Sequence, residues 1–82
     1  MEEFKLKWET LDGGEYVSEW MTGQSARRRF DAKRKDLHNE IVWCELIYSP
    51  LGENAPDEEQ VIDSFERRKI EILGAIILVP GK

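Results

Sequence analysis

The segment IVWCELIYS, residues 41–49, is rich in β-branched and aromatic side chains and is followed directly by Pro50. This composition predicts a strand that stops at the proline. Glu45 is the only charged residue in the segment. Because burying a carboxylate without a partner is costly, Glu45 should face water. Side chains alternate along a strand, so the inward set becomes Val42, Cys44, Leu46 and Tyr48, and the outward set becomes Ile41, Trp43 and Ile47.

The outward set is the first candidate site, because three apolar side chains on one face are too much apolar surface to leave in water. Two explanations remain open. Either the apolar C-terminal segment, residues 70–82, forms a fifth strand or a short helix that covers this face, or the three side chains bind another protein. Tryptophan is enriched among the residues that dominate binding at protein interfaces, which makes Trp43 the candidate anchor beside Ile41 and Ile47.

The N-terminal segment FKLKWETL, residues 4–11, alternates in polarity, and EYVSEWM, residues 15–21, follows the turn formers DGG. This pattern predicts a hairpin. A two-residue loop would direct Glu19 to the buried face, whereas a three-residue loop at residues 12–14 leaves it outward. We therefore predict the register that pairs Thr10 with Tyr16, Trp8 with Ser18, Leu6 with Trp20 and Lys7 with Glu19.

The segment SARRRFDAKRKDL, residues 25–37, has a helical period, with Thr22 or Ser25 as the N-cap and Asn39 as the C-cap. Its inner stripe spans about 60° of the helix circumference. We predict that this stripe lies across the Trp8 face of the sheet. The stripe consists of Ala26, Phe30, the alkyl stem of Lys33, and Leu37.

The rest of the chain divides into three parts. Residues 50–59 are rich in turn formers and predict a loop. The segment QVIDSFERRK, residues 60–69, is ambiguous, because acids at its start and bases at its end suit a helix dipole, while its β-branched residues suit a strand. We favour a fourth strand. Residues 70–82 form the apolar C-terminal segment.

Together these segments predict one α+β domain over residues 1–82, a small antiparallel sheet in the order ββαββ with one helix packed on one face. The stretches FKLKWETLDGG, WMTGQSARRRFDAKRKDL, IVWCELIYS and QVIDSF carry this layout. In their spacing they resemble the small, mostly uncharacterised ββαββ proteins of phage and prophage genomes. The resemblance implies a non-catalytic accessory protein that binds a host or viral macromolecule.

The net charge of −5 is unevenly distributed. Residues 24–39 hold six bases and two acids, whereas residues 40–66 hold eight acids and no base. On a helical wheel the bases surround the helix instead of forming one stripe, which is typical of a solvated exterior. The candidates for binding a charged ligand are Arg27, Arg28, Arg34 and Lys35.

Two alternative functions follow from these charges. In the first, the basic helix at residues 25–37 contacts nucleic acid, although a chain with a pI near 4.9 lacks the general electrostatic footprint of a nucleic-acid binder. In the second, the acidic span at residues 40–66 imitates the spacing of phosphates and inhibits a protein with a basic cleft.

The sequence predicts no catalysis. His38 is the only histidine and lies at the expected helix end, where an imidazolium favours the helix dipole. Cys44 is expected to point inward, and the chain has no phosphate-binding glycine loop, no C-x-x-C and no H-E-x-x-H. We therefore predict a protein that is not an enzyme and that uses no cofactor and no metal.

One cysteine, a charged start and a longest apolar run of nine residues predict a cytoplasmic protein without a membrane segment. The favoured function is a protein-interaction module. It binds a protein partner or self-associates through Trp43, Ile41, Ile47 and residues 70–82.

Overall fold

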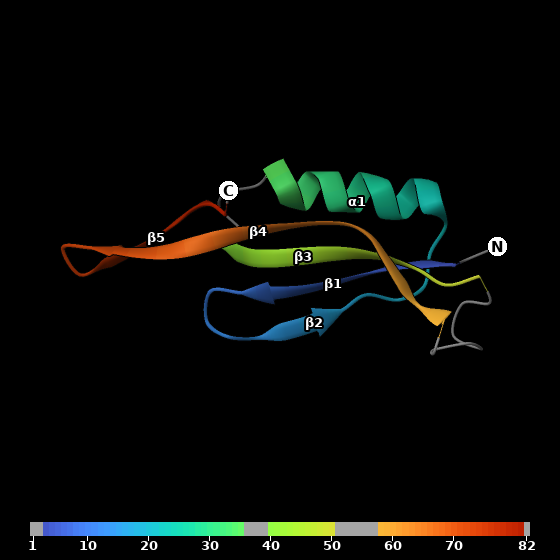
Figure 1. The fold of residues 1–82 in the computed structure, drawn as a ribbon, viewed down its shortest axis with the longest axis horizontal. Coiled ribbons are helices and arrows are strands. Elements are labelled where there is room, and N and C mark those ends of the chain that lie inside the picture. The colour runs from blue at the N-terminus through green and yellow to red at the C-terminus, as the bar shows by residue number, and fades with distance from the viewer. Residues whose placement is uncertain (1–2, 36–39, 51–57, 82) are drawn as a thin grey trace.

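The computed structural model describes residues 3–35, 40–50 and 58–81. These residues form an antiparallel sheet of five strands in the order β2-β1-β3-β4-β5, with one helix between β2 and β3 in the chain (Figure 1). The fold agrees with the predicted α+β class, but the five-stranded sheet dominates it, and the layout is not a clear ββαββ arrangement. The elements are β1 (Phe4–Thr10), β2 (Glu15–Val17), α1 (Gly23–Lys35), β3 (Ile41–Tyr48), β4 (Gln60–Ile72) and β5 (Ala75–Pro80).

The first turn has the predicted length but begins one residue early. Thr10 N–H donates to the Gly14 carbonyl (2.9 Å), and Gly13 takes the left-handed position with φ of 92°. The Asp12 side chain fixes this loop, because it accepts hydrogen bonds from Gly14 N–H and from the Thr10 hydroxyl. The predicted register is therefore wrong by two residues, and Trp8 pairs with Tyr16. A shift of two keeps the faces, so the rings of Trp8 and Tyr16 stack at 5.7 Å.

The residues after β2 also differ from the predicted pairing. Instead of Trp20 pairing with Leu6, Met21 bridges Phe4 and is buried at 6 % exposure. Trp20 lies under the Lys5 ammonium, 4.7 Å from its ring centroid. The cause is Ser18, whose N–H and hydroxyl both bond to the Leu6 backbone and end the regular ladder.

Glu19 is exposed, as predicted, but its partner is different. Its carboxylate accepts a hydrogen bond from Arg29 of α1 at 2.7 Å and does not pair with Lys7. Lys7 instead has Val17 and Glu45 as its cross-strand neighbours.

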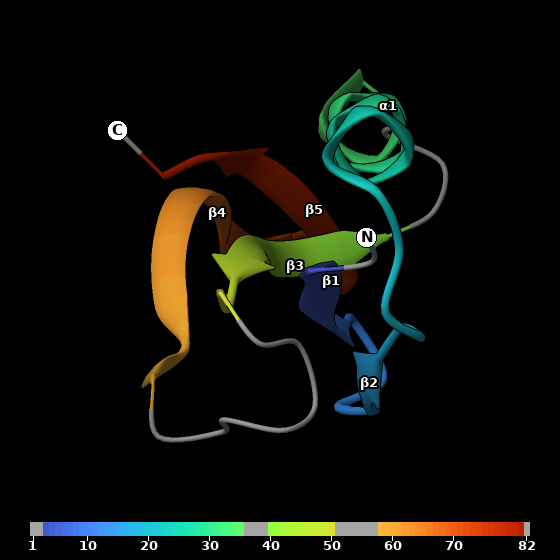
Figure 2. The same ribbon diagram turned by 90° about the vertical axis from the view of Figure 1, so that its right-hand side faces the viewer.

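The helix begins at the predicted cap and covers one face of the sheet (Figure 2). The Thr22 hydroxyl accepts a hydrogen bond from Ser25 N–H at 3.2 Å. Ala26 and Phe30 are fully buried, and the Lys33 ammonium sits 4.0 Å from the Trp8 ring centroid, so these parts of the predicted stripe are confirmed. The core comprises Leu6, Met21, Ala26, Phe30, Ile41, Cys44 and Leu46. Leu37, His38 and Asn39 lie outside the described residues.

The faces of β3 follow the prediction except at its start. Cys44 and Leu46 enter the core on the helix side, while Glu45 is the cross-strand neighbour of Lys7 on the outer face. The prediction for Ile41 is wrong, because it lies in the core at 2 % exposure. The register of β1 and β3 shifts between Trp43 and Ile41, so Val42 is an extra residue that reverses the alternation.

The ambiguous segment 60–69 is a strand, part of β4, as favoured. The basic end of this segment nevertheless contacts a helix terminus, because Arg67 lies beside the C-terminal end of α1. The guanidinium donates to the carbonyls of Arg34 (2.6 Å) and Lys33 (3.4 Å), and also to that of Ile41 (2.8 Å). Carbonyls in the last turn of a helix have no partner within the helix, so Arg67 satisfies them and joins α1, β3 and β4.

Replacing Arg67 with methionine leaves these carbonyls without their charged donor. We expect the free energy of unfolding to fall by about 1.5–3 kcal/mol, the usual range for hydrogen bonds to charged groups. Arg68→Met is the matched control, because Arg68 is exposed and its loss should change stability by less than about 0.5 kcal/mol. Urea unfolding followed by tryptophan fluorescence measures both, and equal effects of the two variants would contradict this role.

Candidate interaction surface

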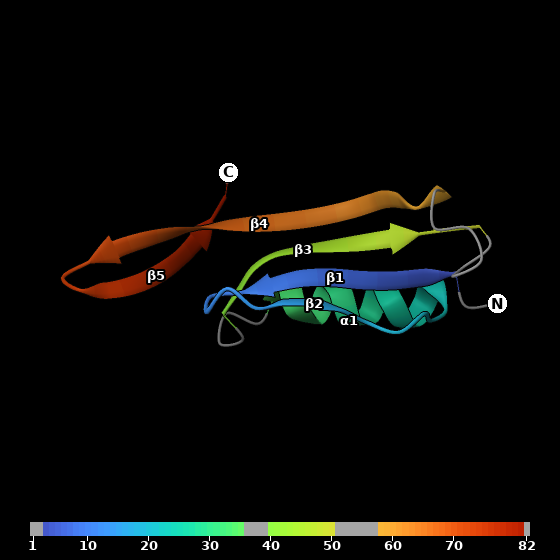
Figure 3. The ribbon, with the colours of Figure 1, turned by 90° about the horizontal axis from the view of Figure 1, so that it is seen from below.

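The strand β4 is longer than its partner β3, and the excess forms a projection. Pairing with β3 runs from Gln60 to Glu66, and the residues of β4 after Glu66 pair only with β5. We refer to residues 67–80 as the arm. Figures 1 and 3 show the arm extending past the ends of α1, β1 and β3, which accounts for the elongated dimensions of 47 × 22 × 21 Å.

A two-residue turn closes the arm. Ile72 pairs with Ala75, and between them Leu73 and Gly74 have φ values of 51° and 82°. Positive φ at both positions is the geometry of the tight turn that matches the twist of two antiparallel strands. Glycine adopts it freely, but a leucine there is strained. The Leu73 side chain at the tip is also fully exposed, at 102 %.

One face of the arm is apolar. Directly opposed residues of an antiparallel pair share a face, so Ile70 lies with Ile77, and Ile72 lies with Ala75. Ile72 and Ile77 are 51 % and 44 % exposed. On the other face, apolar residues of β5 lie opposite Lys69 and Glu71 of β4. We refer to the first of these faces as the apolar face; Arg68 lies on it at the base of the arm, opposite Val79, and its apolar residues are Ile70, Ile72, Ala75, Ile77 and Val79.

The predicted patch on β3 is not assembled. Ile41 lies in the core on the helix side, and Ile47 is only 5 % exposed. Trp43 is half-buried on the outer face, where its indole N–H donates to the Glu9 carboxylate at 2.9 Å. Residues 75–80 extend the edge of the sheet beside β4 and do not cover a face of β3. In the C-terminal part of the prediction, Ile72, Leu73, Ile76 and Ile77 are exposed. The other exposed large apolar side chains are those of Tyr16, Val17, Val61 and Ile62.

Sequence reasoning identified these C-terminal residues as apolar but missed their hairpin. The usual signal for a two-residue hairpin is Asn-Gly or Asp-Gly between alternating segments, and this chain has Leu73-Gly74. Gly74 lies between the apolar residues 72–73 and 75–79, and a glycine in that place indicates a turn.

The four bases predicted to bind a charged ligand lie in two different surroundings. Arg27 and Arg34 both bind Asp63 of β4, at 2.6 and 3.3 Å. The Arg27 hydrogen bond holds the pKa of the Asp63 carboxyl below its usual value. The guanidinium of Arg34 also lies 4.9 Å from the Phe30 ring centroid. Arg28 and Lys35 are exposed on α1. These two of the four predicted bases are therefore presented to solvent without an ion pair to Asp63.

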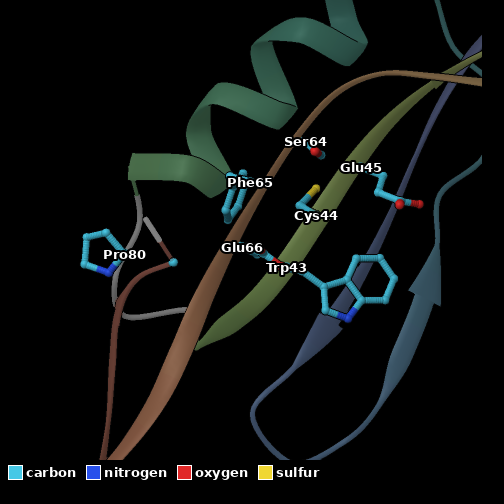
Figure 4. Close-up of a pocket in the computed structure, with 8 residues that line it drawn as sticks. Trp43, Cys44, Glu45, Ser64, Phe65, Glu66 and Pro80 are labelled. Carbon is cyan, nitrogen blue, oxygen red and sulfur yellow. The ribbon is translucent and has the colours of Figure 1, made fainter.

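An open hollow of about 560 Å³ lies where β3 and β4 meet the base of β5 (Figure 4). Cys44 is a packed core residue, as predicted, and burial raises the pKa of its thiol to about 11. Within the described ranges no three His, Cys, Asp or Glu side chains are grouped to hold a metal ion. The lining residues are Trp43, Cys44, Glu45, Ser64, Phe65, Glu66, Pro80 and Gly81.

Searches against family models, curated proteins and solved structures returned no match for this chain. In the part of the chain that the structure covers, no helix is long and apolar enough to cross a membrane.

The lowered pKa of the Asp63 carboxyl predicts that the free energy of unfolding depends on pH. An aspartate in the unfolded chain has a pKa of about 3.9, and the folded value is lower, so the ion pairs stabilise the fold above that pH and are lost as the pH falls through the folded value. Asp63→Asn should lower the unfolding free energy by about 0.5–1 kcal/mol at pH 7 and low salt, and the effect should shrink as the pH falls below about 3.9. Urea unfolding across pH measures this. Asp31→Asn is the control, because its distance to Arg27 is 4.0 Å, and an equal or larger effect there would contradict the assignment.

The burial of Cys44 predicts that its thiol reacts slowly with reagents in solution. A disulfide exchange reagent at pH 8 should modify the folded protein only as fast as it opens, because the thiol is fully buried and its pKa is about 11. A Leu73→Cys variant provides the fast reference within the same chain. Absorbance of the released thiolate follows both, and immediate reaction of Cys44 would place it on the surface.

Proposed function

We propose that this chain is a non-catalytic interaction protein whose binding element is the arm, which contacts a protein partner or a second copy of the chain. The observation that carries the proposal is an apolar two-stranded ribbon that projects from the core with its side chains exposed. Ile72, Ile76 and Ile77 are each about half exposed, and Leu73 is fully exposed.

The arm is poorly suited to remain alone in water. A two-stranded ribbon that packs against nothing is at best marginally stable. Binding that covers its apolar face removes surface from water at about 25 cal/mol per Å², which stabilises the ribbon and supplies affinity together. Soluble proteins rarely keep such patches without an interaction that uses them.

Leu73 supports a binding role in particular. Its left-handed conformation would suit asparagine or glycine, so a leucine at this turn weakens the hairpin. Burial of the Leu73 side chain does not offset this loss of hairpin stability, since the side chain is fully exposed. Strained residues concentrate at sites with a function other than folding. A leucine at the tip of a projecting arm is well placed to insert into an apolar pocket of a partner.

The basic helix is a weaker candidate for the binding element. Arg27 and Arg34 are already bound to Asp63, and Arg29 to Glu19, so three of the bases on α1 are engaged within the molecule. A nucleic-acid backbone would have to displace these partners. The arm, by contrast, is already accessible without displacing any of these contacts.

Leu73→Asn separates binding from folding. Asparagine tolerates the left-handed turn, so the variant should be at least as stable as the natural chain. It should nevertheless bind its protein partner about ten- to a hundredfold more weakly, because burying a leucine is worth about 1.5–3 kcal/mol. Capture from an extract of the source cell by tagged full-length chains, quantified by mass spectrometry, measures the loss.

Arg28→Asn is the matched control, because it changes an exposed residue on α1, away from the arm. It should capture the same proteins as the natural chain. Equal capture by all three chains would contradict the arm as the binding element, and selective loss with Arg28→Asn would favour the basic helix.

A further inference from the structure

We infer that the arm pairs with a second copy of this chain, edge to edge along β5, around a two-fold axis at Ile77. The inference rests on the proposed function, since it uses the same arm, and it names the partner and the register. Three features of the arm lead to it: an unprotected strand edge, the direction of the backbone groups on that edge, and a self-complementary sequence.

Over residues 75–79, the outer edge of β5 lacks the devices that keep strands apart. β5 ends the sheet order, and residues 75–79 carry no charge. Exposed edges are normally guarded by charged residues, by prolines, by bulges or by being very short, and β5 has one of these devices, Pro80, at its last position. The other edges are guarded in this way. β2 has three residues and includes Glu15, and the part of β4 that lies in the arm begins with Arg67, Arg68 and Lys69.

The backbone groups that face outward can be assigned. Gly81 N–H donates to the Glu66 carbonyl at 3.0 Å, which makes these two residues a hydrogen-bonded pair. Such pairs alternate along an antiparallel ladder, so Ile77 and Val79 direct their N–H and C=O groups towards β4. Ile76 and Leu78 therefore direct theirs to the free edge. The turn agrees with this assignment, because its flanking residues then form the closing hydrogen-bonded pair.

One register uses all of these outward groups. With the two-fold axis at Ile77, Ile76 lies opposite Leu78 of the second copy, and each donates one hydrogen bond and accepts one. Moving the axis to Leu78 would set Ile76 opposite Pro80, which has no N–H. Moving it to Ile76 would set Leu78 opposite Gly74, which lies in the turn.

The side chains agree with the same register. Directly opposed residues share a face, so Ile77 meets Ile77 of the second copy, and Ala75 meets Val79. A small residue is thus paired with a larger one, and the apolar faces of the two arms become continuous. The bases on the two β4 strands lie three strand spacings apart, about 14 Å, which exceeds the screening length of about 8 Å at physiological salt.

Disulfide trapping tests the register directly. In the proposed pair, Ile77 lies opposite its own counterpart at a non-hydrogen-bonded position, with a Cα separation of about 4.5 Å, which a disulfide can bridge. The full chain with Ile77→Cys should form a covalent dimer under mild oxidation. Leu73→Cys is the control for random collision, because that position is more exposed than Ile77 but lies far from its counterpart. We expect Ile77→Cys to cross-link at least tenfold faster. Buried Cys44 should not interfere.

A second variant tests the hydrogen bonds. Leu78→Pro removes one outward N–H and none of the bonds to β4, so the hairpin should persist, as circular dichroism can verify. In the Ile77→Cys chain it should reduce the cross-linking rate to that of Leu73→Cys. Leu78→Ala keeps the N–H and should cross-link faster than Leu78→Pro.

Several outcomes would overturn the inference. One is an Ile77→Cys rate equal to that of Leu73→Cys, and another is a natural chain that stays monomeric by light scattering up to about millimolar concentration. A Leu78→Pro rate as fast as that of Leu78→Ala would also reject edge pairing. Each of these outcomes would leave the proposed function standing if Leu73→Asn still loses its captured partner, so the two failures are distinguishable.

Discussion

The mismatch in length between β3 and β4 is the constraint on which the rest of this structure depends. β4 continues for six residues beyond Glu66, the last residue that pairs with β3. β3 starts at Ile41, directly after Glu40, a residue with φ of 53°. Backbone groups of a strand must find hydrogen-bond partners. The excess of β4 finds them only because the chain folds back through Leu73 and Gly74 as β5. A projecting ribbon is therefore the direct result of two strands that end at different places.

The junction between body and arm is held by polar groups, because the core is small. Arg67 binds the end of α1 and the start of β3 at the point where the arm departs. Four residues before Arg67 in β4, Asp63 ties α1 to β4 through Arg27 and Arg34. The bases of α1 thus have a structural use, and several hold the helix over the thin core instead of forming a binding stripe. The arm takes no part in these ion pairs and exposes apolar side chains, as do Tyr16 and Val17 of β2 and Val61 and Ile62 of β4.

Polarity predicted much of the body from the sequence. Glu19 and Glu45 were placed outward, and Cys44, Leu46, Ala26 and Phe30 inward, because the free energy of burying a charge or exposing an apolar group is large compared with local propensities. The errors in the prediction occurred where a single residue, in a bulge or in a loop, determines the face or the pairing of the residues beside it. The bulge at Val42 moved Ile41 to the other face. The first loop lies at residues 11–13 instead of 12–14, which moved the pairing of the first hairpin by two residues. Neither choice is encoded in the polarity pattern.

The arm was harder to predict for a different reason. An apolar segment ordinarily covers a core, so residues 70–82 were expected either to pack on β3 or to bind a partner. Whether this segment covers the core or projects from it depends on the length of β4 relative to β3. That difference in length depends on where each strand ends, and hydrophobic periodicity predicts strand ends poorly. The turn at Leu73-Gly74 also lacks the Asn or Asp that would have marked it.

Amide hydrogen exchange along β5 tests the central claim most directly. In dilute solution, the amides of Ile77 and Val79 should be protected by their bonds to β4, while those of Ile76 and Leu78 should exchange as fast as in an unstructured chain. This alternation would establish a folded ribbon with a free outer edge. Rapid exchange at all four positions would show that the arm is not formed, and protection of Ile76 and Leu78 in the dilute monomer would show that their edge is already occupied within the chain.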